Sequence, residues 1–188
     1  MAVPEYQTFM LPLLQLAADQ KEHLLSEAYE VLAQQFNLTE EERTALLPSG
    51  KQSRFENRVG WARTYLKKAE LLDSVGRGKF RITSRGLDVL KTKPSSISRD
   101  FLTQYPEFRE FQTRQNTKSD DERELIEQDK TPDEILDSTY QQLRRTLAQD
   151  LLERVKNGSP RFFENVVLDL LLAMVRWTHL SRHKKYHS

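Results

Sequence analysis

The chain has 188 residues, a net charge of +1, 37% hydrophobic residues and no cysteine. This length is enough to bury a core in one or two small domains. The lack of cysteine excludes a disulfide framework and a thiolate metal site, and the apolar runs are too short to cross a bilayer. The N-terminus has no basic and apolar leader pattern. We therefore expect a cytoplasmic protein with no membrane partner.

Charge is segregated along the chain even though the total is close to zero. Residues 1–50 carry a net charge of −6 and residues 51–93 carry +8, whereas 94–140 carry −6 and 141–188 carry +5. The block at +8 predicts a basic face, and basic faces attract phosphate. A solvated helix face with no partner is the alternative interpretation of the charge alone.

The first 50 residues predict short helices around a shared core. Apolar side chains recur at helical spacing over residues 5–18 and again over residues 26–36. Thr39 and Glu42 form a capping-box pattern, which opens a short helix that ends near residues 47–50. Helices of this length are stabilised chiefly by packing. The residues expected to pack are Tyr6, Phe9, Met10, Leu13, Leu14, Ala17, Ala28, Val31, Leu32 and Phe36.

A basic helix and a basic hairpin come next. Ser53 and Glu56 form a second capping-box pattern, and we expect the helix to run to about Glu70. At about 100° per residue, one side of this helix is apolar and the opposite side is polar. Residues 71–75 and 79–83 then predict two strands around a glycine-rich turn, followed by a helix over about 84–90. The apolar side carries Phe55, Val59, Ala62 and Leu66, and the polar side carries Ser53, Asn57, Gly60, Thr64, Lys67 and Lys68.

This order of elements is that of a winged helix-turn-helix, although modules that bind only protein share it. In helix-turn-helix docking, the N-terminal half of the second helix reaches base edges in the major groove. Arginine can pair with guanine and asparagine with adenine, while cations on the wing can neutralise backbone phosphates. We therefore expect double-stranded DNA as a partner, the alternative being that these cations are solvated or pair with the acidic first 50 residues. The candidate DNA-binding residues are Lys51, Gln52, Arg54, Asn57, Arg58, Lys68, Arg77, Lys79 and Arg81.

The remainder of the chain predicts an extension, a linker and a second helical region. Six apolar side chains between residues 97 and 111 can pack back on the first domain, and the polar, acidic stretch over 113–130 predicts a flexible linker. Thr131 and Glu134 form a third capping-box pattern, which opens a helix that stops at Asn157. The helix that follows is apolar on nearly all sides, which is typical of a helix inside a larger structure.

Several stretches of the chain resemble a known family. Residues 4–111 resemble the N-terminal domain of the Mrr restriction proteins, on the segments PEYQTFMLPLL, LPSGKQSRFENRVGWARTYLKKAELL, GKFRIT and YPEFREF. Residues 151–174, LLERVKNGSPRFFENVVLDLLLAM, resemble the first helices of the family's catalytic domain. The resemblance implies a winged-helix DNA reader joined to a magnesium-dependent nuclease of the PD-(D/E)xK fold, which cuts foreign DNA bearing methylated bases.

The resemblance sets the expected domain organisation. We expect a mainly α fold with an Mrr-type winged-helix domain over 1–112 and an acidic linker over 113–130. The incomplete start of a nuclease-like domain would occupy 131–174, and a divergent basic tail 175–188.

The catalytic groups that the resemblance implies are not found in the last residues. Such nucleases hold Mg²⁺ with clustered carboxylates, of which Glu164 matches one position, whereas residues 175–188 contain no Asp or Glu. We therefore expect a truncated or frameshifted product that binds DNA without cutting it and needs no cofactor. The histidines of the tail, four residues apart, have no further ligand nearby, so no metal site is expected.

Two other functions stay open at this point. The chain could nick DNA as an oligomer that pools carboxylates from several copies, or it could be a protein-interaction module that associates with intact family members. We also expect self-association through residues 132–174, because exposed apolar helices tend to find a partner.

Overall fold

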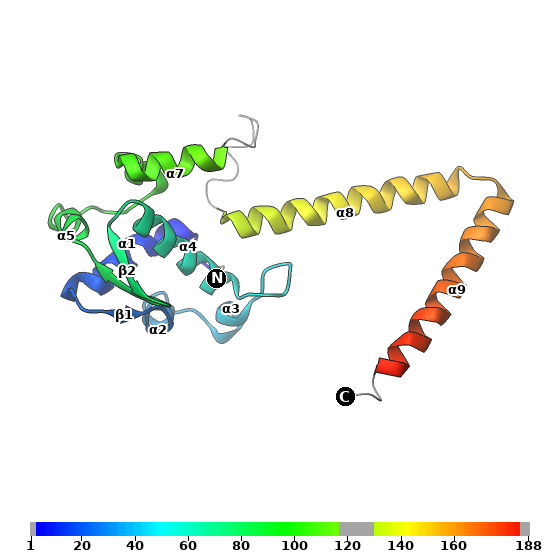
Figure 1. Cartoon of the computed structure of the whole chain (residues 1–188), viewed down its shortest axis with the longest axis horizontal. Helices are drawn as coiled ribbons and strands as arrows, with labels where there is room; N and C mark the ends of the chain where they lie inside the picture. Colours follow the sequence, from blue (N-terminus) through cyan, green and yellow to red (C-terminus); the bar gives the residue numbers. More distant parts are fainter. Residues whose placement is uncertain (1–2, 117–129, 185–188) are drawn as a thin grey trace. The chain divides into compact units, whose positions relative to one another are not determined.

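The computed structural model describes residues 3–116 and 130–184. These residues are mainly helical and include a small three-stranded sheet (Figure 1). The chain divides into two compact units, Met1–Ser138 and Thr139–Ser188. The first unit holds η1 (Tyr6–Phe9), α1 (Met10–Leu16), η2 (Ala17–Asp19), β1 (His23–Leu24), α2 (Leu25–Gln35), α3 (Glu40–Thr44), α4 (Arg54–Lys68), β2 (Leu72–Gly76), β3 (Lys79–Ile82), α5 (Ser84–Lys91), α6 (Arg99–Leu102), α7 (Pro106–Asn116) and the start of α8 (Pro132–Lys156).

The core of the first unit forms where η1 and α1 pack against α4. All six apolar residues expected to pack in the first segment are buried, and Phe9 lies at the centre. Its ring meets Phe36 and Phe55 in edge-to-face geometry, with centroids 5.0 and 5.6 Å apart, an arrangement that aromatic quadrupoles favour. The predicted apolar side of α4 is confirmed, because Phe55, Val59, Ala62 and Leu66 are all buried.

Two predictions for α2 and α3 need correction. Val31 was expected in the core but is 44% exposed, and the buried residues of α2 are Ala28, Leu32 and Ala33. The helix α3 ends at Thr44, earlier than expected, because the chain after it becomes extended. Leu46 and Ser53 form an antiparallel bridge there, and the Arg54 amide donates to the Ala45 carbonyl.

The sheet contains the predicted hairpin and one strand that the sequence did not indicate. β2 and β3 pair antiparallel, and Gly78 has a φ of 71°, which its lack of a Cβ allows. The two-residue strand β1 adds to β3, with His23 opposite Phe80, to give the order β1-β3-β2. A strand of two residues is too short to leave an alternating pattern in the sequence.

The extension after the sheet packs on the first unit as predicted. Ile97, Leu102 and Phe108 are buried, and the other three predicted residues are partly buried. The helix α7 continues to Asn116, so the first four residues of the predicted linker are helical. Residues 117–129 of that linker lie outside the described residues.

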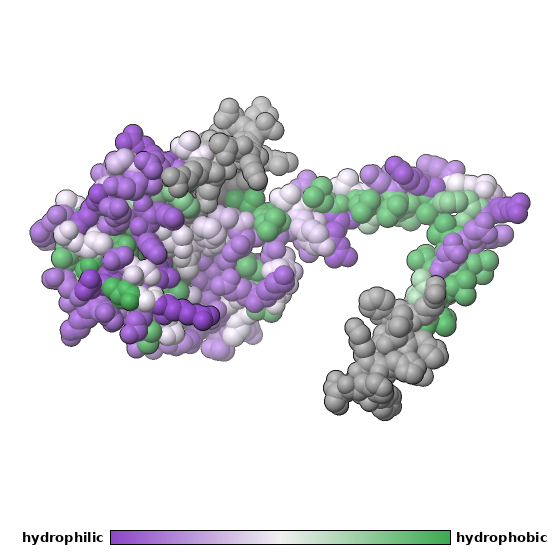
Figure 2. Space-filling view, viewed as in Figure 1, coloured by the Kyte–Doolittle hydropathy of each residue, from purple (hydrophilic) through white to green (hydrophobic). Residues whose placement is uncertain are grey.

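The second unit holds the rest of α8 and α9 (Pro160–Lys184), separated at Asn157 and Gly158 as predicted. The apolar side chains of both helices are largely exposed, and Figure 2 shows them as continuous apolar stretches. Within the described part of the chain, no helix combines the length and the apolar character needed to span a membrane. The exposed apolar residues are Tyr140, Leu143, Leu147, Leu151, Leu152, Phe162, Phe163, Val167, Leu168, Leu170, Leu171, Leu172, Met174 and Val175.

Candidate nucleic-acid interface

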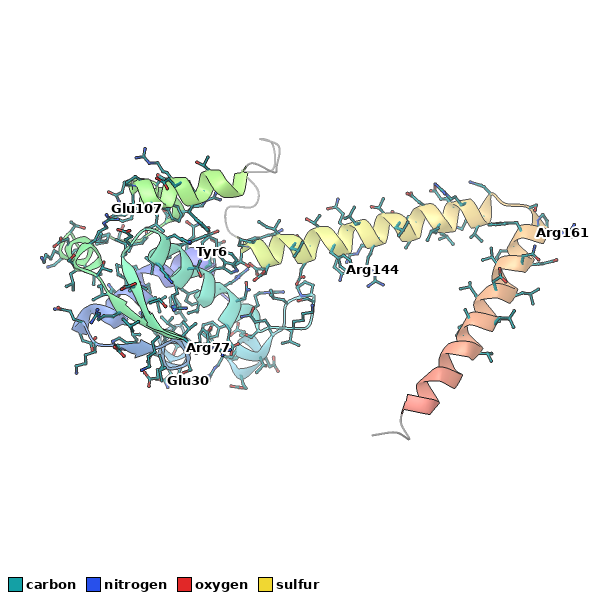
Figure 3. The ribbon with its side chains drawn as sticks, in the orientation of Figure 1. Tyr6, Glu30, Arg77, Glu107, Arg144 and Arg161 are labelled. Atoms are coloured by element: carbon teal, nitrogen blue, oxygen red, sulfur yellow. The ribbon has the colours of Figure 1, made fainter. Side chains whose placement is uncertain are left out.

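The β2–β3 hairpin presents its predicted cations to solvent. Alternation along β3 buries Phe80 and Ile82, which leaves Lys79 and Arg81 on the outer face. Arg77 lies on the turn between the strands and is exposed (Figure 3). Lys79 approaches Glu22 at 3.5 Å, but both side chains are about half exposed, and such pairs contribute little stability. These cations can therefore reach a polyanion at small cost.

The predicted DNA-binding residues around α4 differ in their exposure. Lys51 and Gln52 are exposed in the turn before the helix, and Arg54 on the first turn keeps 41% of its side chain exposed. Lys68, at the other end of α4, is also exposed and lies 5.0 Å from the centroid of the Phe111 ring. The cation–π contact holds Lys68 near α7 without removing its charge from solvent.

Asn57 was expected on the polar side of α4, but it is only 2% exposed. Its side-chain amide donates to the Gln52 Oε1 at 3.2 Å and to the Asp133 Oδ2 at 2.6 Å. Its Oδ1 accepts a hydrogen bond from the Thr131 hydroxyl at 2.6 Å. The expectation of a solvent-facing Asn57 is corrected here, because residues at the start of α8 cover it.

Arg58 is also largely covered, with 14% of its side chain exposed. Its Nη1 donates to the carbonyls of Val3 and Pro4 at 2.6 and 3.0 Å. Its Nε and Nη2 lie 3.0 and 2.8 Å from the Glu134 Oε1. Arg54 reaches the same carboxylate oxygen at 3.8 Å. The acidic partner of these arginines therefore lies in residues 131–137, not in the first 50 residues.

We call residues 131–137 the acidic segment. The predicted capping box is present, because the Thr131 amide donates to the Glu134 Oε2 at 2.9 Å and the Glu134 amide donates to the Thr131 hydroxyl at 3.3 Å. Two further contacts hold the segment against α4 and the loop before it: the Trp61 indole donates to the Asp133 Oδ2 at 3.1 Å, and the Ser49 amide donates to the Asp137 Oδ2 at 3.0 Å.

A cavity of about 250 Å³ lies beside this contact, lined by residues that include Arg54, Arg58, Lys130 and Glu134. Three cations and one carboxylate therefore line one hollow. Sequence reasoning identified Arg54 and Arg58 but missed the acidic segment as their neighbour. The capping-box pattern and the acidic character of residues 131–137 were the available signals, yet neither says where the segment docks.

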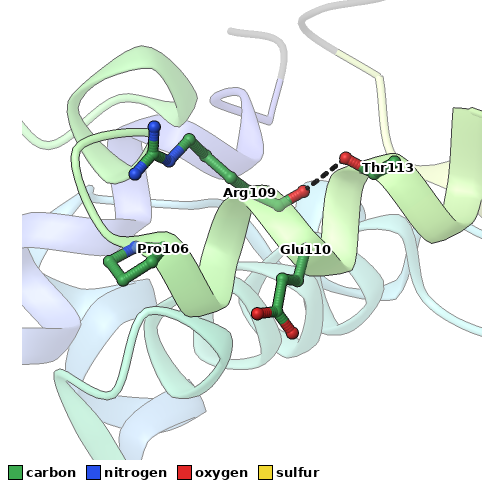
Figure 4. Close-up of a pocket in the computed structure, with 4 residues that line it drawn as sticks. All are labelled: Pro106, Arg109, Glu110 and Thr113. Atoms are coloured by element: carbon green, nitrogen blue, oxygen red, sulfur yellow. Dashed lines mark hydrogen bonds between the residues drawn. The ribbon is translucent and has the colours of Figure 1, made fainter.

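A shallow hollow on α7 is lined by Pro106, Arg109, Glu110 and Thr113, and the Thr113 hydroxyl donates to the Arg109 carbonyl at 3.0 Å (Figure 4). No group of three or more potential metal ligands occurs among the residues that the structure describes. The backbone of His179 and His183 belongs to α9, but their side chains are not described. His187 lies outside the described residues altogether.

The Arg85 guanidinium forms an ion pair near the first unit's surface. It donates to both carboxylate oxygens of Glu107, at 3.1 and 3.2 Å, and lies 5.2 Å from the Tyr105 ring centroid. The hydrogen bonds from Arg85 lower the pKa of Glu107 below its usual value. The pair ties α5 to α7, so its role is structural.

Comparison with known proteins adds two matches. Residues 6–92 match the family model described as the Mrr N-terminal domain. The chain is 31% identical over 182 residues to the type IV methyl-directed restriction enzyme EcoKMrr of Escherichia coli strain K12. The alignment covers 91% of this chain and 59% of that enzyme. No solved structure matches the chain.

Proposed function

We propose that this chain is the DNA-binding part of an Mrr-type restriction system, because residues 6–92 match the family model described as the Mrr N-terminal domain. The chain spans 59% of the length of its methyl-directed relative, so recognition of methylated DNA is part of the proposal. A protein of this kind would act in the cytoplasm, where foreign DNA is met.

The fold supports a winged helix-turn-helix. Helix α1, strand β1, helices α2 to α4 and the β2–β3 hairpin follow one another, and the strands order as β1-β3-β2. In this assignment α4 is the reading helix and the β2–β3 turn is the wing. The N-terminal turn of a reading helix faces base edges, which gives Arg54 the role of a base-contacting residue.

One observation carries the proposal: several cations of the basic block keep exposed or partly exposed side chains on two parts of the same fold. Lys51 precedes α4 and Arg54 lies on its first turn, while Arg77, Lys79 and Arg81 lie on the hairpin. A polyanion can therefore be contacted without unfolding any element. Because DNA carries closely spaced phosphates, such an arrangement gains affinity from counterion release.

The salt dependence of binding tests this proposal. If the full chain neutralises about four to six phosphates, the logarithm of its affinity for duplex DNA should fall with the logarithm of salt concentration with a slope of about −4 to −5. Fluorescence anisotropy of a labelled duplex measures the slope. A flat slope would support the alternative, a protein-interaction module that associates with intact family members, since apolar binding weakens little with salt.

We further propose that this chain binds DNA without cutting it. Glu164, the position that matches the family's nuclease, lies on α9, and the nearest acidic residue of that helix is Asp169. Five residues correspond to about 140° around a helix, so these two carboxylates point in different directions. They do not fit a magnesium site, which needs clustered oxygen ligands. Incubation with Mg²⁺ and methylated or unmethylated plasmid tests this; cleavage that disappears in Glu164→Ala would contradict it.

The exposed apolar side chains of α8 and α9 indicate a partner besides DNA. Leu143, Leu147 and Leu151 are each more than half exposed on α8, and α9 carries more such residues. Large exposed apolar patches mark interaction sites. We propose that residues 132–174 associate with a second copy of this chain.

A further inference from the structure

We infer that the acidic segment is an internal occupant of the DNA-reading surface, and that DNA must displace it to reach Asn57 and Arg58. The inference rests on the proposed function. It adds a regulatory contact, because the same chain holds both the reading residues and a group that competes with DNA for them.

The contacts place the acidic segment on the reading turn of α4. The two residues with the strongest potential for base contacts, Asn57 and Arg58, donate hydrogen bonds to Asp133 and Glu134. Trp61, one turn further along α4, also donates to Asp133. Arg54 lies 3.8 Å from the same Glu134 oxygen. Consecutive turns of the helix therefore share the acidic segment as their partner.

The chemistry of the contact matches that of DNA. A carboxylate, like a phosphate, offers anionic oxygens to a guanidinium; the Glu134 Oε1 accepts a hydrogen bond from the Arg58 Nε and lies 2.8 Å from its Nη2. The Asn57 amide, which can pair with adenine, has both its donor and its acceptor satisfied by Asp133 and Thr131. Any base or phosphate at these groups must replace the segment's oxygens.

Burial strengthens this competition. Thr131 is fully buried and Glu134 is 8% exposed, so little of the contact between the segment and α4 is open to solvent. The segment is covalently attached to the domain that it covers, which raises its effective concentration there. The observed affinity for DNA should then equal the intrinsic affinity reduced by the fraction of molecules in which the segment has left.

Matched charge-removing variants of the full chain test the inference. The double variant Asp133→Asn with Glu134→Gln removes two charges while preserving side-chain size, and glutamine can still complete the capping box. We expect this variant to bind duplex DNA about tenfold more tightly than the unmodified chain, within the usual range for coupled sites. The control is Asp150→Asn with Glu153→Gln, which removes two charges from exposed positions on the same helix.

The two double variants separate competition from general electrostatics. A gain in affinity that is several-fold larger for the Asp133 and Glu134 variant supports the internal occupant. Equal gains in the two variants overturn it, since charge alone then explains them. If the unmodified chain binds DNA with a steep salt slope, the proposed function stands in either case; if no form binds DNA, the proposed function itself fails.

A reversible crosslink provides a second test. The chain has no cysteine, so Ser49→Cys with Asp137→Cys introduces one possible intramolecular disulfide, at positions that already touch through the Ser49 amide and the Asp137 carboxylate. Oxidation should lower DNA affinity about tenfold or more, and reductant should restore it. If the crosslinked and the reduced forms bind DNA with the same affinity, the inference is overturned.

Discussion

Arg54 is a partly exposed cation and Arg77 an exposed one, and the backbone around them assigns them different contacts. Arg54 occupies the first turn of α4, while Arg77 lies on the turn of the hairpin. In the proposed winged helix, Arg54 faces base edges and Arg77 faces the phosphate backbone. Their contributions to sequence discrimination should therefore differ.

Substitution of each residue tests this division. Arg54→Ala should lower discrimination between duplex sequences by about 1–3 kcal/mol if the guanidinium pairs with a base. Arg77→Ala should weaken all duplexes alike and reduce the salt slope by about one. Asn57→Ala should behave like Arg54→Ala once DNA has displaced the acidic segment. Competition binding on a panel of duplexes measures all three, and identical behaviour would contradict the assigned roles.

The Arg85–Glu107 pair predicts a pH dependence of stability. Because the pKa of Glu107 is lowered in the folded chain by its hydrogen bonds from Arg85, the ionised form stabilises the fold. That contribution is present above the ordinary carboxyl pKa and is lost as pH falls through the lowered value. Glu107→Gln should therefore lower the melting temperature at neutral pH and have little effect in strong acid. Glu153→Gln, at an exposed position, is the control. If Glu107→Gln lowered the melting temperature by the same amount at every pH, the prediction would be contradicted.

At the residue level, helical spacing predicted the burial of the α4 side chains only in part. Helical spacing correctly placed Phe55 and Leu66 in the core and Arg54 outside it. It failed for Asn57, because the chain that covers this residue returns 74 to 76 positions later. Periodicity reports which side of a helix is polar, but it contains no information on a distant segment that docks there.

Local signals explain why most elements of the first unit could be predicted. Ser53 accepts a hydrogen bond from the Glu56 amide at 3.5 Å, and Thr39 accepts one from Glu42 at 3.3 Å, as the capping patterns indicated. The glycine-containing turn likewise identified the β2–β3 hairpin. β1 and the early end of α3 escaped prediction because both depend on hydrogen bonds to residues elsewhere in the chain.

Two glycines offer a sharp test of helix packing. Gly86 lies in α5 so close to Leu71, which precedes β2, and to β3 that an added Cβ would stand 2.3 Å from the Leu71 carbonyl oxygen and 2.7 Å from the Ile82 Cγ1. Gly86→Ala should lower the free energy of unfolding by about 1–3 kcal/mol or more, because the backbone at Leu71 would have to move to relieve the clash. Urea unfolding measures this value.

Gly60 is the matched control, since nothing lies within 4 Å of an added Cβ there. It occupies the interior of α4, where alanine has the higher helix propensity. Gly60→Ala should raise the free energy of unfolding by about 0.5–1 kcal/mol. If the two substitutions had effects of the same sign, the close packing of α5 against the sheet would be contradicted.

At the scale of the whole molecule, the charge blocks of the sequence become interacting surfaces. The +8 block supplies α4 and the hairpin, while part of the following acidic block supplies Asp133, Glu134 and Asp137. The net charge of +1 therefore hides an internal contact between blocks of opposite sign. Salt should weaken this contact as well as DNA binding, because both depend on pairs of opposite charges.

The exposed apolar helices lead to the prediction of self-association. Tyr140, Leu143, Leu147 and Leu151 are each more than 50% exposed at one side of α8, and α9 is apolar around much of its circumference. At about 25 cal/mol per Å² of apolar area, burying each large side chain contributes roughly 1.5–3 kcal/mol. Several such residues outweigh the entropy of bringing two chains together.

We therefore expect the full chain to self-associate through residues 132–174, whereas residues 1–112 alone should be monomeric. Sedimentation velocity at tens of micromolar compares the two. Leu147→Glu with Leu151→Glu should shift the full chain toward the monomer, because a buried, unpaired carboxylate opposes association. As a control, Arg144→Glu with Arg145→Glu changes the charge of the same helix at exposed polar positions and should have a smaller effect. If the full chain sediments as a monomer, the apolar side chains of α8 and α9 are buried against other parts of the same chain instead.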